Sequence, residues 1–298
     1  MSGPAPLLFD RALARRRLSR ALAGRYAGFL LERASAELED RLAAVMRSFP
    51  RALDLATPIP AAAALLARDG RVGEVVRLAG IPDPTASLVG DDEALPFAPA
   101  SFSLVVSLLA LHGSNDLPGA LAQVRRCLAP DGLFLGCLLG GETLTELRLA
   151  FGEAESEQEG GASPRVAPFG DVRALGGLLQ RAGFALPVVD LDRVVVRYPH
   201  MFALMADLRA IGWTNTLVER RRTPLRRATL VRAAALYGER FSDPDGRIRA
   251  TFDLVWLSGW APHESQQRPL RPGSARTRLA EALGVPEFGP DGISGDGS

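Results

Sequence analysis

The sequence predicts an α/β protein in which helices cover both faces of a mainly parallel sheet. From residue 52 onward, short apolar segments alternate with segments of helical periodicity. The segment at residues 102–109 is almost continuously apolar, as expected for a central strand with helices on both sides. A length of 298 residues with 47% hydrophobic residues is sufficient for a large core.

Composition excludes several kinds of chemistry. All 35 basic residues are arginine, so neither a Schiff-base lysine nor a P-loop lysine is present. The net charge of +1 provides no field for nonspecific nucleic-acid binding, and we expect no nucleic-acid partner. The two cysteines, Cys127 and Cys137, fit buried thiols, and we expect no metal site.

The compartment follows from the lack of targeting patterns. No apolar run approaches the roughly 20 residues of a membrane span, and the first residues do not form a signal peptide. We expect a cytoplasmic protein of bacterial type. The mitochondrial matrix is expected only for a eukaryotic source.

The first predicted element is a helical extension at residues 1–48. Within residues 9–47, Leu31, Ala34 and Leu38 recur at helical spacing between charged residues. Pro50 is expected to stop this helical segment.

The sheet is predicted within a domain at residues 49–262. An Ala-rich helix is expected after the first strand, and Asp116 is expected to cap a helix at residues 115–128. Pro130-Asp131-Gly132 predicts a turn back into the sheet. The expected strands lie at residues 52–56, 74–78, 87–89, 103–109, 133–138, 188–197 and 250–260.

Further helices are predicted between the late strands. Two of them are expected at residues 143–157 and before Gly183, and residues 198–240 are expected to be helical. The resulting insertion, at about residues 199–247, is predicted to form a lid over the edge where open sheets bind ligands. Residues 263–298 form a Pro/Gly-rich tail whose end is predicted to be disordered.

Three segments resemble class I S-adenosylmethionine-dependent methyltransferases, which have a Rossmann-like fold. They are the acidic Leu-Pro-Phe loop at residues 90–97, the strand at residues 101–107 and the strand entry at residues 128–132. The resemblance implies S-adenosylmethionine as the cofactor.

More specific segments resemble the methyltransferase-like assembly factor family of respiratory complex I. The resemblance extends from Phe9-Asp10-Arg11 to about Ala275, and it includes Gly140-Gly141-Glu142-Thr143 and Tyr198-Pro199. It implies methylation or hydroxylation of a protein side chain, such as an arginine of a complex I subunit.

Besides an enzyme of the assembly-factor type, two other functions remain open. Several of the same motifs are similar to the malonyl-carrier-protein methyltransferase of biotin synthesis, which implies a small-substrate methyltransferase. The third possibility is a cofactor-free assembly scaffold, because the cofactor-binding loop is altered. The oligomeric state does not follow from the sequence.

The loop after the first strand departs from the pattern that the resemblance implies. S-adenosylmethionine requires close backbone approach at its amino-acid end, for which the family has glycine at the positions of Ala56 and Pro58. The family's ribose-binding acid is also missing from the region of Arg77 to Gly80. Candidate cofactor-binding residues are therefore Asp54, Ala56, Thr57, Asp91, Asp92 and Ser107.

Two of these acids match acids of the family pattern. Asp54 matches the acid of the first motif, and Asp91 matches the acid that accepts a hydrogen bond from adenine. A structural interpretation is also open for each: Asp54 would hold a loop and Asp91 would cap a turn.

Catalytic residues are not defined by a motif, and His112 and Glu142 are the candidates. His112 is a possible base or a wall residue, while Glu142 would bind a cationic substrate or interact with a helix dipole. Gly113 stands where the family has tryptophan, and this difference would either open space over the pocket or reflect loss of the pocket. Candidate substrate or lid residues are Gly140, Gly141, Tyr198 and Trp213.

Overall fold

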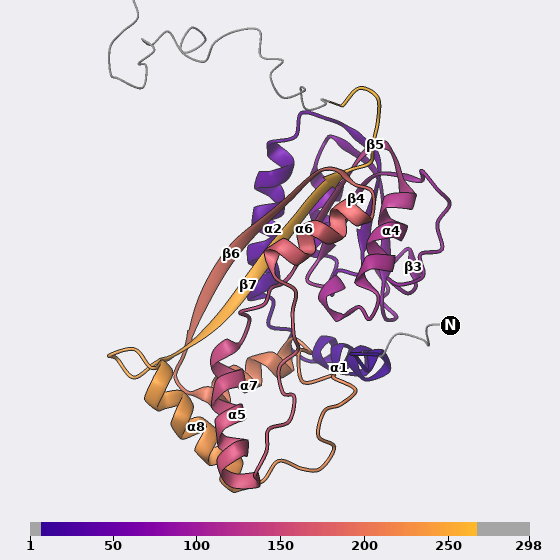
Figure 1. Cartoon of the computed structure of the whole chain (residues 1–298). Coiled ribbons are helices and arrows are strands. Elements are labelled where there is room, and N and C mark those ends of the chain that lie inside the picture. The colour runs from indigo at the N-terminus through magenta and orange to yellow at the C-terminus, as the bar shows by residue number, and fades with distance from the viewer. Residues whose placement is uncertain (1–6, 267–298) are drawn as a thin grey trace, which may run out of the picture. The chain divides into compact units, whose positions relative to one another are not determined.

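The computed structural model describes residues 7–266 (Figure 1). The predicted disordered end of the tail lies outside the described residues. The helices and strands are α1 (Arg11–Ala23), α2 (Phe29–Ala43), β1 (Phe49–Leu55), α3 (Ala61–Arg68), β2 (Val72–Ala79), β3 (Leu88–Val89), β4 (Phe102–Leu108), η1 (Leu111–Gly113), α4 (Leu117–Cys127), β5 (Leu128–Leu139), α5 (Thr145–Glu159), α6 (Val172–Arg181), β6 (Ala185–Tyr198), α7 (Met201–Ala210), α8 (Arg227–Phe241) and β7 (Ile248–Trp260).

The described strands form one sheet in the order β3-β2-β1-β4-β5-β7-β6. Strands β1 to β5 are parallel, whereas β7 runs antiparallel to both β5 and β6. The predicted mainly parallel α/β fold is therefore confirmed. The carboxyl ends of β1, β2 and β4 meet at one edge, which is where ligands bind in open sheets of this kind.

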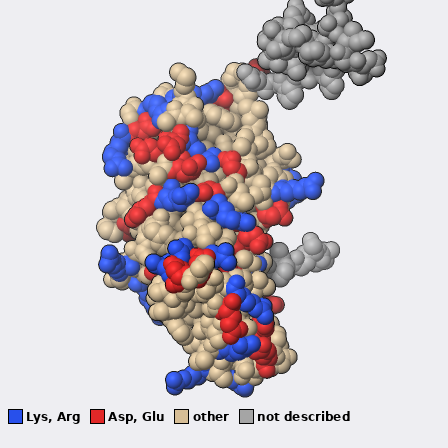
Figure 2. Space-filling view, turned by 90° about the vertical axis from the view of Figure 1, so that its left-hand side faces the viewer, with Lys and Arg blue, Asp and Glu red and all other residues tan. Residues whose placement is uncertain are grey.

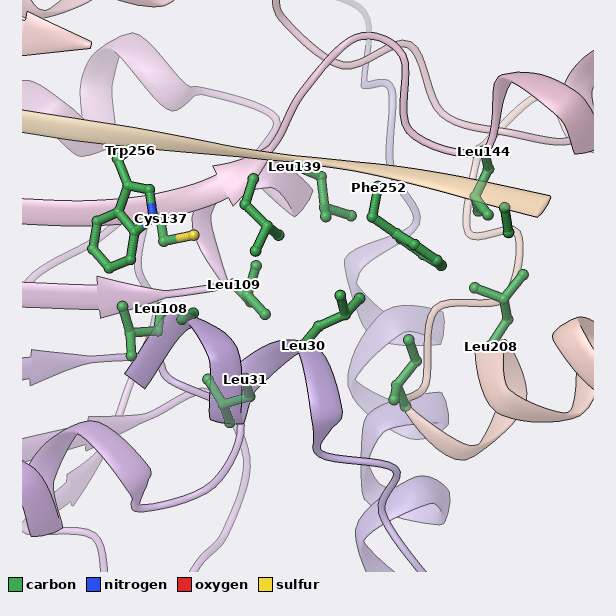
Figure 3. Packing of buried hydrophobic residues seen from close by; sticks show 14 of the residues in the cluster. Leu30, Leu31, Leu108, Leu109, Cys137, Leu139, Leu144, Leu208, Phe252 and Trp256 are labelled. Carbon is green, nitrogen blue, oxygen red and sulfur yellow. The ribbon is translucent and has the colours of Figure 1, made fainter. Parts of the chain in front are cut away.

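Helices cover the sheet on both faces, as the continuously apolar central strand predicts. Buried residues of α2 and α3 join one hydrophobic cluster, and those of α4 and α6 join the other. Figure 3 shows Leu30 and Leu31 of α2 in the first cluster with Leu108 of β4 and Trp256 of β7. Each fully buried side chain of this size contributes about 1.5–3 kcal/mol, so the two clusters hold the strands in register.

Helices α1, α5, α7 and α8 lie beyond the carboxyl edge of the parallel strands (Figure 1). Helix α1 packs against α7, and α8 packs against both α5 and α7. The lower ends of the long β6 and β7 strands lie beside them. This helical group covers the edge at which the site is expected.

The prediction of continuous helix across residues 9–47 is wrong at its centre. Helix α1 ends at Ala23 and α2 begins at Phe29, with Gly24 as the C-cap of α1 and Gly28 as the N-cap of α2. The intervening Tyr26 packs against the first hydrophobic cluster. Packing of this aromatic side chain turns the chain between the two helices.

The prediction of helix throughout residues 198–240 is also only partly right. Tyr198 ends β6, and residues 211–226 between α7 and α8 form no helix. Gly212 has a φ of 79°, and Leu217 forms an isolated β-bridge with Phe9. Pairing with the N-terminal segment thus replaces helix in this loop.

The predicted turn at Pro130-Asp131-Gly132 lies within β5, which begins at Leu128. Asp131 has a φ of 61°, and the register between β4 and β5 shifts near this point. The turn residues therefore distort the strand instead of preceding it.

Charges of both signs intermingle on the surface shown in Figure 2. Arg33 and Arg41 of α2 pair with Asp192 and Asp190 of β6, with Arg33 Nε 2.6 Å from Asp192 Oδ2. No helix among the described residues has the length and apolarity needed to cross a membrane.

Candidate functional site

A cavity of about 360 Å³ lies at the carboxyl edge of the parallel strands. Ala56 and Pro58 after β1, Gly80 after β2, and Leu109 and Ala110 after β4 form its sheet side. Residues of α1, α5, α7 and the loop after α7 form the other side. Within the predicted insertion at residues 199–247, the residues that line the cavity belong to α7 and to the loop that follows it.

The loop after β1 enters the cavity with an unusual backbone. Ala56 has a φ of 58°, a left-handed conformation that favours glycine. Its N–H donates to the carbonyl of Leu78 at 2.8 Å. Thr57 is buried, and its hydroxyl accepts the N–H of Leu108 at 3.2 Å. The loop therefore keeps a glycine-like path although its residues are not glycine.

Asp54 lies behind this loop and does not line the cavity. Its partner in the β1–β2 register is Arg77, and Arg77 Nε lies 3.4 Å from Asp54 Oδ2. Both side chains are buried. Burial raises the pKa of Asp54 to about 6, and the Thr57 hydroxyl and the Arg77 guanidinium partly offset this effect.

Arg77 ties the ends of β1 and β2 to neighbouring loops. Its guanidinium donates to Asp83 Oδ2 at 2.8 Å, to Thr85 Oγ1 at 3.2 Å and to the Thr57 carbonyl at 3.1 Å. A buried guanidinium with this many partners is a structural group. Asp54 is thus placed beside a guanidinium that holds the loop after β1.

The acidic loop after β3 binds helix α1. Arg11 Nη1 lies 2.8 Å from Asp91 and 2.7 Å from Glu93, and Arg11 Nη2 also pairs with Asp92. Arg15 binds Asp91 Oδ2 at 2.8 Å. Burial raises the pKa of Asp91, but the Glu93 N–H, Arg15 and Arg11 hold it below its ordinary value.

Only Asp92 of these three acids lines the cavity. It is buried, and the hydroxyl of Ser114 donates to its Oδ2 at 2.7 Å. Each oxygen of Asp92 therefore has a protein partner.

Asn115 fixes the N-terminal segment beside the cavity. Its side-chain oxygen accepts the N–H groups of Leu8 at 2.9 Å and Phe9 at 2.7 Å, and its amide donates to the Phe9 carbonyl at 3.1 Å. On the other side, the Asp10 N–H donates to the Thr216 carbonyl at 2.8 Å. Residues 8–10 are thus held between two loops, and α1 is placed over the cavity.

His112 lies in η1 and lines the cavity between two aromatic rings. The centroid of its ring lies 5.2 Å from that of Trp213 and 5.8 Å from that of Phe169, both edge to face. Its Nδ1 is buried and has no hydrogen-bond partner among the described residues. Burial lowers the pKa of His112 to about 4, so the imidazole is neutral at pH 7.

Gly113 leaves space next to this histidine. A Cβ atom built at Gly113 would meet nothing within 4 Å, and both Gly113 and Trp213 line the cavity. The expected opening of the pocket at residue 113 agrees with this geometry.

Gly140 and Glu142 belong to a loop that is attached to β7. The Gly140 N–H donates to the Asp253 carbonyl at 2.8 Å, and the Glu142 N–H donates to Asp253 Oδ2 at 3.3 Å. Asp253 is buried and accepts two hydrogen bonds from Arg193, at 2.7 and 3.0 Å. Glu142 is exposed and does not line the cavity beside His112.

Three further candidates lie away from this cavity. Ser107 is buried in β4, and Tyr198 is buried at the end of β6 in the first hydrophobic cluster. Gly141 lies with Glu142 at a separate depression beside α6. The structure therefore brings Ala56, Asp92, His112 and Trp213 to one cavity and leaves the other candidates outside it.

The sequence interpretation missed the contributions of α1 and of the loop before α6. Arg11 and Arg15 come from α1, and Phe169 precedes α6. The segment Phe9-Asp10-Arg11 was the available signal for α1. Phe169 carries no pattern of its own, because its position depends on the path of a loop.

Comparisons with known proteins agree with this fold. A family described as "Methyltransferase domain" matches residues 58–136. The arginine-hydroxylase NDUFAF5, mitochondrial, of Danio rerio is 39% identical over 288 residues, which cover 92% of this chain and 89% of the relative. The human protein of the same name is 41% identical over 275 residues, covering 89% and 79%.

Other relatives are more distant. The malonyl-[acyl-carrier protein] O-methyltransferase of Xylella fastidiosa is 38% identical over 180 residues, 60% of this chain and 59% of the relative. The solved structure of the YcgJ protein of Bacillus subtilis has a TM-score of 0.51 at 15% identity, covering 78% of this chain and 99% of that protein. This last likeness shows the fold alone.

Proposed function

We propose that this chain, a member of the NDUFAF5 arginine-hydroxylase family of the class I methyltransferase superfamily, acts on an arginine side chain of a protein partner. The proposed partner is a complex I subunit, and the proposed role is in complex I assembly. The relatives at 39% and 41% identity are named as mitochondrial, and the cytoplasm is the compartment that we propose for this chain.

The observation that carries the proposal is the group of rings around His112. Trp213 and Phe169 flank this histidine inside the cavity. A guanidinium is planar and weakly hydrated, so it stacks on aromatic faces and interacts with their π-electrons. A neutral imidazole adds a hydrogen-bond acceptor without repelling the cation.

The charges of the cavity wall are mostly compensated. Arg11 is paired with acids of the loop after β3, Arg15 is paired with Asp91, and Arg165 is paired with Glu155. Arg209 also lines the cavity, is exposed, and has no ion-pair partner among the described residues. A guanidinium would therefore meet most repulsion at Arg209 and least beside His112.

The proposed modification is methylation of that arginine, or its hydroxylation, which inserts one oxygen atom and therefore needs molecular oxygen and a two-electron reductant. Methylation would require S-adenosylmethionine, the cofactor that the superfamily uses, and the positions that would have to hold it are those of Ala56 and Gly80 on the sheet side of the cavity. His112 would orient the guanidinium and accept one of its hydrogen bonds.

A second candidate function rests on Arg209. An unpaired guanidinium on the wall of a mainly apolar cavity suits a carboxylate, such as the free carboxyl of a malonyl group on a carrier protein. The relative of Xylella fastidiosa is named for that substrate. The two candidates therefore require different residues of the same cavity.

The test measures binding of arginine-containing peptides that tile the complex I subunits of the source organism, with citrulline versions as controls. For a peptide that binds, we expect Trp213→Ala to weaken affinity about tenfold, because a desolvated cation–π contact contributes ~1–2 kcal/mol. Arg209→Ala should leave affinity unchanged or increase it.

The opposite pattern would support the carrier-protein function. In that case malonyl-carrier protein binds, Arg209→Ala abolishes binding, and citrulline replacement in the peptides has no effect. Equal affinity for arginine and citrulline peptides contradicts the arginine proposal.

A further inference from the structure

We infer that the sheet side of this cavity does not hold S-adenosylmethionine. Whatever the partner, the polar groups of the cofactor find few matching groups among the residues at the ends of β1, β2 and β4.

S-adenosylmethionine presents polar groups that need specific partners. Its ribose diol and ammonium group donate hydrogen bonds, and folds of this kind supply a carboxylate at the end of the second strand for the ribose. Its carboxylate accepts hydrogen bonds, which backbone N–H groups of a glycine loop supply.

The residue after β2 has no side chain that could accept hydrogen bonds from the ribose. Ala79 ends β2, and Gly80 follows it on the cavity wall. A Cβ atom built at Gly80 would meet nothing within 4 Å, so the place of an acidic side chain is open space. Asp92 is the only acidic residue among the described lining residues, and its oxygens already accept from Arg11 and Ser114.

The loop after β1 offers few donors. The Ala56 N–H is bound to the Leu78 carbonyl, and Pro58 and Pro60 have no N–H. Pro58 also lines the cavity and adds ring atoms where close backbone approach is needed.

The acid of the first strand is not available either. Asp54 is buried behind the loop and faces Arg77, which donates to the carbonyl of Thr57 inside that same loop. The contacts of Arg77 hold the loop in place from the protein side. A loop fixed in this way does not depend on a cofactor for its conformation.

The inference is tested by binding of S-adenosylhomocysteine, and of S-adenosylmethionine itself, to the full chain. Calorimetry and thermal shift need no partner and no turnover, so this result is independent of the peptide experiment above. We expect neither binding heat nor a shift of the melting temperature for the wild type up to about 1 mM ligand.

A restored variant provides the positive arm. The triple variant combines Ala56→Gly and Pro58→Gly, which let the backbone approach the ligand, with Gly80→Asp, which adds an acceptor for the ribose. We expect it to bind S-adenosylhomocysteine at least tenfold more tightly than the wild type does. Gly80→Asp alone should give a smaller gain, which keeps the test valid if the triple variant unfolds. Gly70→Asp is the matched control, because Gly70 also has open space and does not line the cavity.

Each outcome decides the inference. A dissociation constant below about 1 mM for either ligand and the wild type would overturn it directly. If the triple variant and Gly80→Asp are folded but bind the ligand no better than Gly70→Asp, the missing cofactor binding is not caused by Ala56, Pro58 and Gly80, and the inference is overturned. A gain confined to the variants with Gly80→Asp supports the inference.

Discussion

Ala56 shows at the scale of one residue how this chain keeps a fold while changing a site. Its φ of 58° costs an L-residue other than glycine about 1–2 kcal/mol. The conformation persists because the Ala56 N–H is bound to Leu78 and because Thr57 is bound to both Leu108 and Arg77. Local hydrogen bonds therefore hold a strained alanine in a backbone path that suits glycine.

Ala56→Gly is expected to stabilise the protein by about 1 kcal/mol. The substitution removes the strain of the left-handed conformation, and the packing lost with one methyl group is smaller than this gain. The measurement is the free energy of unfolding by urea. The control is Ala62→Gly, at a fully buried position of α3, which should destabilise. A lower stability for Ala56→Gly would contradict the strained-alanine interpretation.

His112 should make stability sensitive to acid. Burial lowers its pKa from 6.5 to about 4, so between these values the unfolded state binds a proton that the folded state does not. The free energy of unfolding therefore falls as pH falls through this window. Relative to His112→Asn, the wild type should lose about 3 kcal/mol between pH 7 and pH 4.

Asp54 acts in the opposite direction over part of the same range. Its pKa is raised from 3.8 to about 6, so its contribution is present below pH 3.8 and is lost as pH rises through 6. The difference between wild type and His112→Asn cancels this effect, since both proteins contain Asp54. Parallel pH profiles for the two proteins would show that His112 is not buried in its neutral form.

At the scale of elements, the Gly140-Gly141 loop lies between β5 and α5 and is hydrogen-bonded to Asp253 of β7. A Cβ atom at Gly140 would lie 2.6 Å from Val255 Cγ2 and 3.0 Å from Asp253 Cβ, whereas one at Gly141 would meet only the Phe169 carbonyl oxygen, at 3.7 Å. The first glycine is required for close packing of β7, and the second is not. In the Gly140-Gly141 pair, the structural role therefore belongs to Gly140.

Gly140→Ala should destabilise the protein by about 1–3 kcal/mol, because the added methyl group displaces β7. Gly141→Ala, one residue later, should change stability by less than about 0.5 kcal/mol. Thermal unfolding of the two variants compares them directly. Equal losses would indicate that the pair has a shared role, such as ligand contact, instead of packing.

The order of the elements could be predicted from apolar patterns, but their exact contacts could not. The strands and the cap at Asp116 follow from local sequence, and Asp116 Oδ1 accepts the Gly119 N–H at 2.8 Å. The break at Gly24 and the loop at residues 211–226 depend on packing between distant segments, as in the bridge between Phe9 and Leu217. Such pairing leaves no periodic signal in either segment.

At the scale of the whole molecule, distant parts of the sequence converge on one cavity. Helix α1 covers it through Arg11 and the acidic loop, α7 and its following loop close it, and η1 contributes His112. His112, Asp92 and Trp213 could be selected from sequence as candidates for this site. Their grouping, and the separation of Glu142 and Tyr198 from them, required the fold.

The whole molecule also shows how the chain can keep the fold of its family while its cofactor-binding positions differ. The sheet order and the two hydrophobic clusters depend on apolar residues throughout the chain. Cofactor binding would depend on a few positions such as Ala56, Pro58 and Gly80. Substitution at these few positions can alter ligand binding while the fold and the partner cavity remain.

The most direct test of the central claim is site-specific crosslinking from inside the cavity. A photoreactive amino acid at position 113, where the cavity is open, is introduced into the full chain in cells of the source organism, with Gly70 as the control position. The account predicts that position 113 crosslinks to a complex I subunit within a few residues of an arginine, and that Trp213→Ala removes this product. Crosslinks to a carrier protein, or the same products from position 70, would contradict it.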